Sequence, residues 1–149
     1  MRKRYFIHVM LCFVMLFFGV AQAKSASPVG LWKTFDDTSG KPSSLVRISE
    51  KNGELSAVIV KDLLPSAEND MVCDKCQGNL KDKPIIGLPI MESMKQNGEY
   101  YEGGTILDPD NGEIYHCKLK LDASGNKLEV RGFVGVSLIG RTQIWMREQ

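Results

Sequence analysis

The chain has 149 residues, of which 19 are Lys or Arg and 18 are Asp or Glu, and 43% of its residues are hydrophobic. This length suits one domain with a modest core. Beyond residue 23 the basic residues form no run and no patch interleaved with aromatic residues, which argues against a nucleic-acid partner.

The N-terminal segment has the three parts of a secretory signal peptide. Residues 2–4 are basic, residues 5–20 are apolar apart from one histidine, and residues 21–23 form an A-x-A cleavage box. We therefore expect cleavage between Ala23 and Lys24. The alternative is an uncleaved membrane anchor, for which the apolar run is somewhat short, since a spanning helix needs about 20 apolar residues.

Removal of residues 1–23 would leave residues 24–149 as a single domain with no stable membrane span. The signal carries three of the 19 basic residues and no acidic one, so the mature chain has 16 basic and 18 acidic residues, a net charge of −2. The predicted location is the periplasm or the exterior, where cysteines meet an oxidising environment.

The mature chain reads as short strands separated by turns. Two Asn-Gly pairs, at residues 52–53 and 97–98, are strong hairpin signals. About eight strands are expected, which predicts an all-β fold, a small up-and-down, lipocalin-like β-barrel, with a β-sandwich as the alternative. A barrel of eight strands can be filled by side chains or can hold one small ligand. The expected strands are residues 29–35, 45–50, 53–62, 90–95, 99–107, 113–121, 127–136 and 139–148.

One long loop, residues 62–87, interrupts this pattern and carries Cys73-x-x-Cys76 in its middle. Connections of this length are uncommon in compact domains and are often binding loops or lids. We favour a structural disulfide between Cys73 and Cys76. A rival pairing would join Cys117 to one of the loop cysteines, and otherwise Cys117 is a buried free thiol.

Two other interpretations of the cysteine pair have less support. A structural zinc site usually needs four ligands, and the adjacent His116 and Cys117 would point to opposite faces of their strand. A thioredoxin-like centre would need the pair at a helix N-terminus, and the surrounding residues show no such unit. We predict no metal and no cofactor.

No catalytic group stands out elsewhere. The sequence lacks a G-x-S-x-G elbow, and lysines flank His116 on its predicted face, which favours a solvated surface histidine. Residues 108–112, DPDNG, are too short for a twelve-residue calcium loop and are typical of a turn. We predict no catalytic residue.

Several motifs together resemble the secreted bacterial proteins of domain of unknown function family 2147. The resemblance spans nearly the whole mature chain and implies a small exported β-rich domain with no established activity and no catalytic residues to transfer. Its most specific parts are Gly103-Gly104-x-Ile106-x-Asp108-Pro109 and the closing Gly140-Arg141-Thr142-Gln143-x-Trp145.

The chain also resembles lipocalin-like barrels, more weakly. These pair a G-x-W motif on the first strand with an arginine near the last strand, and Gly30-x-Trp32 and Arg141 stand at comparable places. We expect the Arg141 guanidinium to cover the Trp32 indole and help close one barrel end. Trp32, Arg141 and Trp145 are thus the candidates for ligand binding or barrel closure; the alternative is that both tryptophans are ordinary core residues.

Two functional hypotheses follow. The first is a non-enzymatic exported barrel that binds a small or apolar ligand or an envelope protein. The alternative is an envelope enzyme or thiol-redox factor that uses the Cys73-x-x-Cys76 loop.

The exported protein should begin at Lys24. The basic start, the apolar run and the A-x-A box together specify this cleavage site. Intact-mass analysis of protein released from the cell envelope measures the first residue directly. Recovery of the full-length chain in the membrane fraction would contradict this prediction.

Overall fold

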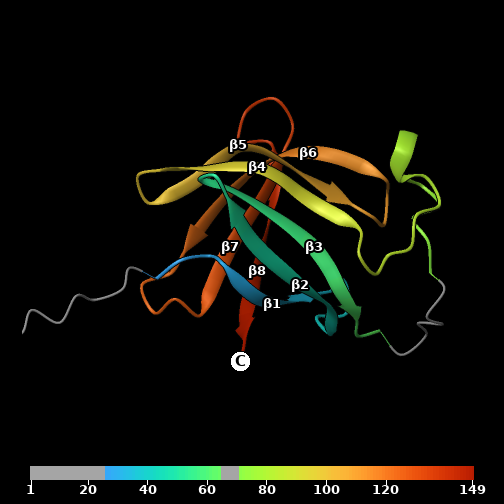
Figure 1. The fold of residues 1–149 in the computed structure, drawn as a ribbon, viewed down its shortest axis with the longest axis horizontal. Coiled ribbons are helices and arrows are strands. Elements are labelled where there is room, and N and C mark those ends of the chain that lie inside the picture. The colour runs from blue at the N-terminus through green and yellow to red at the C-terminus, as the bar shows by residue number, and fades with distance from the viewer. Residues whose placement is uncertain (1–25, 65–70) are drawn as a thin grey trace, which may run out of the picture.

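A computed structural model describes residues 26–64 and 71–149. The predicted signal peptide and its cleavage site lie outside the described residues. Within them, eight antiparallel strands follow one another around a closed barrel (Figure 1). The strands are β1 (Gly30–Phe35), β2 (Pro42–Lys51), β3 (Glu54–Asp62), β4 (Pro89–Asn97), β5 (Tyr100–Asp108), β6 (Glu113–Leu121), β7 (Lys127–Phe133) and β8 (Gly140–Glu148), with the short 3-10 helix η1 (Gly78–Leu80) between β3 and β4.

Hydrogen bonding between β1 and β8 closes the barrel, so the up-and-down fold predicted from the turns is confirmed. Both Asn-Gly signals mark hairpins, although the second turn is Gly98-Glu99 because Asn97 ends β4. Asn52, Gly53 and Gly98 have positive φ, as tight hairpins require. No helix among the described residues is long and apolar enough to cross a membrane.

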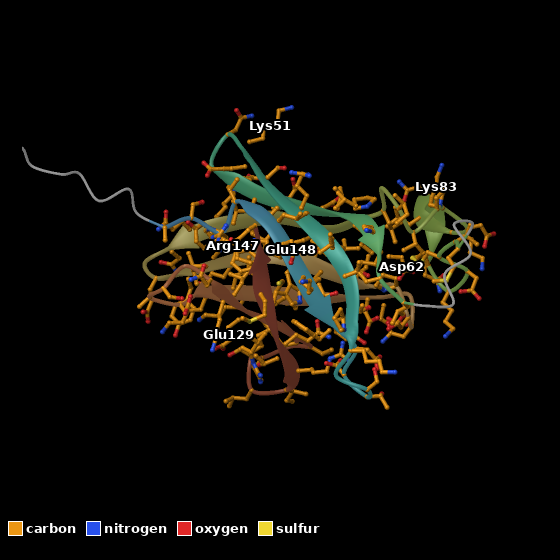
Figure 2. All side chains as sticks on the ribbon, turned by 90° about the horizontal axis from the view of Figure 1, so that it is seen from below. Lys51, Asp62, Lys83, Glu129, Arg147 and Glu148 are labelled. Atoms are coloured by element: carbon orange, nitrogen blue, oxygen red, sulfur yellow. A yellow bond between two sulfur atoms is a disulfide. The ribbon has the colours of Figure 1, made fainter. Side chains whose placement is uncertain are left out.

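The connections divide the barrel into two ends. At the hairpin end, short turns join the strands at residues 52–53, 98–99 and 122–126. At the loop end lie residues 36–41, 63–88, 109–112 and 134–139. Figure 2 shows Asp62, the last residue of β3, towards one end of the molecule, with Arg147 nearer the other.

Apolar side chains fill the hairpin end. They come from inward-facing positions, which alternate along each strand, such as Ile48 on β2 or Cys117 and Leu119 on β6. Trp32 has 0% of its surface exposed, and its indole Nε1 donates a hydrogen bond of 2.7 Å to the Pro28 carbonyl oxygen. Other buried members of this packed half are Leu55, Ala57, Met94 and Leu128.

Arg147 covers Trp32, with its guanidinium carbon 4.3 Å from the ring centroid. The same guanidinium donates hydrogen bonds to three backbone carbonyls, those of Ser27 at 2.7 Å, Val29 at 3.0 Å and Gly125 at 2.6 Å. One side chain therefore ties the N-terminal segment and the turn between β6 and β7 to the first strand.

Gly30 makes room for this arginine. A Cβ at Gly30 would lie 2.6 Å from Arg147 Nη1, and the residue has φ +141°. Any other residue would place its Cβ too close to the arginine, and a positive φ is unfavourable for residues other than glycine. The glycine of the G-x-W motif is thus explained by the side chain that stacks on the tryptophan.

The prediction that Arg141 covers Trp32 is wrong. The register pairs Trp32 with Arg147 and places Arg141 opposite Gly132. Arg141 and Arg147 share one face of β8 but lie about 20 Å apart along the strand, at roughly 3.4 Å per residue. Only the arginine at the hairpin end can reach the indole.

The expected strand over residues 127–136 is also too long. The chain leaves β7 after Phe133, Gly135 adopts a φ of +68°, and Val134 N–H bonds to the Ile139 carbonyl across the loop. The β-branched residues here resemble a strand in the sequence. Their side chains are exposed instead, with 61% of Val134 and 59% of Val136 accessible.

The stacking of Arg147 on Trp32 should appear as a coupling in a double-mutant cycle. Trp32→Ala should cost about 3–5 kcal/mol because it empties a buried site, and Arg147→Met about 2–4 kcal/mol because it removes charged hydrogen bonds. Their coupling should be about 0.5–2 kcal/mol. Urea unfolding followed by circular dichroism measures these terms.

The matched control is Arg141→Met, which changes the same residue type on the same face of β8. Its effect should add to that of Trp32→Ala within about 0.5 kcal/mol. Coupling of Trp32 to Arg141 but not to Arg147 would contradict the observed register.

Candidate functional site

The loop half of the barrel contains a cavity of about 540 Å³. Its wall is mainly apolar and draws on most strands of the barrel, while Met71 and Ile85 of the long loop also contribute. Since the packed residues of the hairpin end do not line it, the barrel is filled at one end and hollow at the other. The apolar wall includes Val46, Ile59, Ile90, Ile106, Val130 and Trp145.

Trp145 forms part of the wall at the boundary between the two halves. Only 2% of it is exposed, and it pairs with Leu128 of the packed half. Its indole Nε1 donates a hydrogen bond of 3.1 Å to Gln143 Oε1. Of the three predicted candidates, Trp145 and Arg141 therefore line the cavity, while Trp32 does not.

A polar network crosses the mouth of the cavity. Gln143 Nε2 donates to both carboxylate oxygens of Asp37, at 3.1 and 3.0 Å. Arg141 Nη1 forms an ion pair of 2.7 Å with Asp37, and Arg141 Nη2 lies 3.4 Å from Asp108 Oδ2. The network joins β8, the loop after β1 and the end of β5, so it fixes the relative positions of three parts of the rim.

Two other aspartates at the mouth differ in their surroundings. The pKa of Asp110 is raised by partial burial and by repulsion from Asp108 and Asp36, and Lys75 and Arg141 oppose the shift only in part. The pKa of Asp36 is instead lowered, because Ser39 donates both its hydroxyl and its backbone N–H to the carboxylate.

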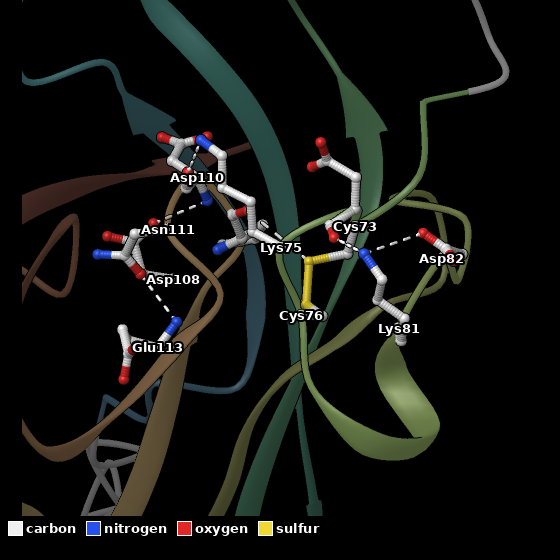
Figure 3. Close-up of a disulfide and its surroundings, with 11 residues drawn as sticks. Cys73, Lys75, Cys76, Lys81, Asp82, Asp108, Asp110, Asn111 and Glu113 are labelled. Atoms are coloured by element: carbon white, nitrogen blue, oxygen red, sulfur yellow. Dashed lines mark hydrogen bonds and ion pairs between the residues drawn. A yellow bond between two sulfur atoms is a disulfide. The ribbon is translucent and has the colours of Figure 1, made fainter.

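The predicted disulfide between Cys73 and Cys76 is present, with both cysteines almost fully buried. Figure 3 shows this bond beside the turn between β5 and β6. Cys73 Sγ lies 3.7 Å from the Pro109 carbonyl oxygen, and Lys75 Nζ donates a hydrogen bond of 2.7 Å to the Asp110 carbonyl. The disulfide segment thus packs against the turn that carries two rim aspartates.

The remaining sulfur and imidazole groups do not form a reactive pair. Cys117 is a buried free thiol, and burial raises its pKa to about 12, so it stays protonated at neutral pH. His116 points outward, where its ring lies 5.6 Å from that of Phe133. Among the described residues, no group of three or more His, Cys, Asp or Glu side chains is placed to hold a metal ion.

Asp37 and Gln143, which belong to the polar network at the mouth, were not predicted as site residues from the sequence. Gln143 could have been found by alternation, because residues 141, 143, 145 and 147 must share one face of the last strand. Asp37 could not have been found in this way, since a loop aspartate has no fixed partner until closure of the barrel brings the first and last strands together.

Comparison with known proteins identifies both a family and a fold. The family model described as "Uncharacterized protein conserved in bacteria (DUF2147)" matches residues 30–147. A solved structure described as protein HP1028 from the human pathogen Helicobacter pylori, which belongs to the lipocalin family, is similar at 20% identity with a TM-score of 0.71. The alignment covers 83% of this chain and 84% of that one, and at this identity it shows the fold alone. No curated protein matches the chain.

Gly112→Ala should reveal how strongly the disulfide segment is seated on the rim. A Cβ at Gly112 would collide with the backbone carbonyl of Lys75, and the residue has φ +77°. We expect a loss of about 2–4 kcal/mol of stability, from backbone strain plus the steric conflict. Chemical unfolding measures the loss.

Gly53→Ala is the matched control, because Gly53 has φ +79° and a Cβ added there would meet no atom within 4 Å. It should cost only the strain, about 1 kcal/mol. Equal losses for the two substitutions would show that the segment is not held against the turn.

Proposed function

Since the chain belongs to the bacterial family DUF2147, for which no activity can be transferred, we propose a function from its cavity: a non-enzymatic, exported barrel that binds one small, largely apolar ligand. The ligand would lie in the loop half, above Trp145, and would enter from the loop end. Sites for small ligands are typically concave, apolar and about 300–1,000 Å³ in volume.

The single observation that carries this proposal is the contrast between the two halves of the barrel. The hairpin half contains large side chains packed without exposed surface, such as Trp32, Leu119 and Leu128. The loop half leaves about 540 Å³ unfilled within an apolar wall. An unfilled apolar volume costs stability, so a barrel that retains one is consistent with a bound ligand.

The similarity to a lipocalin-family structure supports the same proposal, because barrels of this kind have room for one small ligand. Export is part of the proposal as well. The N-terminal signal pattern supports it, and so does the Cys73–Cys76 disulfide, since disulfides persist mainly in oxidising compartments.

An envelope protein is a second candidate partner, and one observation favours it. The loop between β7 and β8 exposes four apolar side chains, with 88% of Leu138 accessible. Two of them, Val134 and Ile139, also line the cavity. Ligand entry therefore accounts for the same surface, and the cavity remains the stronger basis for a function.

The thiol-redox hypothesis gains no specific support from the described residues. Cys73 and Cys76 are 1% and 2% exposed, which leaves little surface for an attacking thiolate. The nearby helix η1 has only three residues and begins after the second cysteine.

Narrowing the cavity should weaken ligand binding without unfolding the barrel. Gly132 lines the cavity on β7, and a Cβ there would make only ordinary contacts, the nearest at 3.5 Å to Ile106. Gly132→Val adds a side chain that suits a strand. The wild type should bind the neutral fluorophore N-phenyl-1-naphthylamine saturably, and the variant should bind it at least about tenfold more weakly.

Ser49→Val is the matched control, because Ser49 is exposed on β2 and its valine would face solvent. It should leave the affinity for the fluorophore unchanged. Absence of saturable binding to the wild type, or equal binding by both variants, would exclude the cavity as the binding site.

A further inference from the structure

The charged side chains around the cavity are almost all of one sign. Five aspartates line it, and its one basic lining residue among those described is Arg141. The aspartates come from three separate parts of the chain, so the barrel assembles the negative charge rather than a single acidic run. They are Asp36, Asp37, Asp62, Asp108 and Asp110.

The positive charge of Arg141 is already engaged. Its guanidinium pairs with Asp37 and Asp108 on opposite sides of the mouth. An incoming carboxylate or phosphate would have to displace one of these partners. The other carboxylates of the mouth would also repel it, so the mouth is poorly suited to an anionic head group.

Three carboxylates at the mouth take part in none of the ion pairs among the described residues: those of Asp36, Asp62 and Asp110. Asp36 and Asp62 accept hydrogen bonds from neighbouring loop groups. The Lys75 ammonium donates a hydrogen bond to the Asp110 carbonyl oxygen, and its positive charge offsets part of the negative charge of these carboxylates. Burial is the main cause of the raised pKa of Asp110, and repulsion from Asp108 and Asp36 adds to it.

The wall beneath these carboxylates is apolar and partly aromatic, with Phe35, Tyr115 and Trp145 among its members. Such a site offers two environments, an apolar wall and a negatively charged mouth, at a separation that one ligand can span. An alkyl chain gains by burial in the wall, while a cation at the mouth gains from carboxylates beside a low-dielectric surface, which strengthens their attraction.

We propose that the cavity selects amphiphiles with a cationic head group, of the alkylammonium class, and discriminates against fatty acids and other anionic amphiphiles. This inference rests on the proposed function and adds to it the charge of the ligand. Selectivity has two sources here, attraction of a cation to the unpaired aspartates and repulsion of an anion by the same groups.

Displacement of N-phenyl-1-naphthylamine by three competitors with the same twelve-carbon chain tests the proposal. Dodecyltrimethylammonium, 1-dodecanol and dodecanoate differ in head-group charge and are used below their aggregation limits, at neutral pH and low salt. Dodecyltrimethylammonium should compete at least about fivefold better than the alcohol, and dodecanoate should be the weakest. The advantage of the cation should shrink in 0.5 M NaCl, where charges are screened within about 4–5 Å.

The double variant Asp62→Asn, Asp110→Asn removes two of the unpaired charges and leaves both Arg141 ion pairs intact. The advantage of the cation over the alcohol should fall at least about threefold. Glu129→Gln is the matched control, because it removes one charge from an exposed position on β7 outside the cavity lining. It should change neither affinity.

The outcomes separate the two proposals. If dodecanoate competes as well as the cation, or if none of the three displaces the bound fluorophore, the inference about charge fails and the binding cavity stands. If the wild type does not bind the fluorophore, both fail. If circular dichroism shows the double variant unfolded, the order of the competitors on the wild type and its salt dependence still decide the question.

Discussion

The contact between Arg147 and Trp32 is the constraint on which the rest of this barrel depends. An open eight-stranded sheet would expose two edges, and the seam between β1 and β8 removes them. That seam has only three paired positions, with Trp32 and Arg147 at its centre. The arginine adds hydrogen bonds to three carbonyls around it, so a short ladder is reinforced by a charged side chain that also seals the hairpin end.

A firmly closed hairpin end allows the other end to be hollow. The stability of a small domain is only about 5–15 kcal/mol, so an unfilled cavity must be offset elsewhere. The offset lies in the packed half, where two of the largest side chains, Trp32 and Trp145, are buried. Trp145 belongs to both halves, since it pairs with Leu128 of the packed half across the strands and also lines the cavity.

The inward face of β8 connects these regions. Period-two alternation places residues 141, 143, 145 and 147 on the same side of the strand. From the loop end to the hairpin end, they are the arginine of the mouth, the glutamine that holds Asp37, the tryptophan of the wall and the arginine of the seal. One strand thus carries parts of the mouth, the wall and the closure.

Much of the fold could be predicted from the sequence, because its signals are local. The Asn-Gly turns and the alternation of residues 113–121 depend only on neighbouring residues, and each predicts a structure that is present. The pairing of Trp32 with an arginine depends on the register between the first and last strands. Local patterns do not contain that register, so the residue type and the strand were predicted correctly and the position was not.

The mouth of the cavity could not be predicted from the sequence for a related reason. Its aspartates are ordinary turn residues when taken one at a time, and they become a site only because separate loops converge at one end of a closed barrel.

The disulfide segment affects the cavity through its contacts with the rim of the barrel. Cys73 and Cys76 close a very short ring, so the bond restricts little of the unfolded chain. Its effect is local, since it shapes a segment that rests on the turn at residues 109–112 and contacts the backbone on either side of Asp110. A bond that contributes little to global stability can still hold a carboxylate of the mouth in position. That role is consistent with its place in the one long loop of the barrel, beside the cavity and away from the seam.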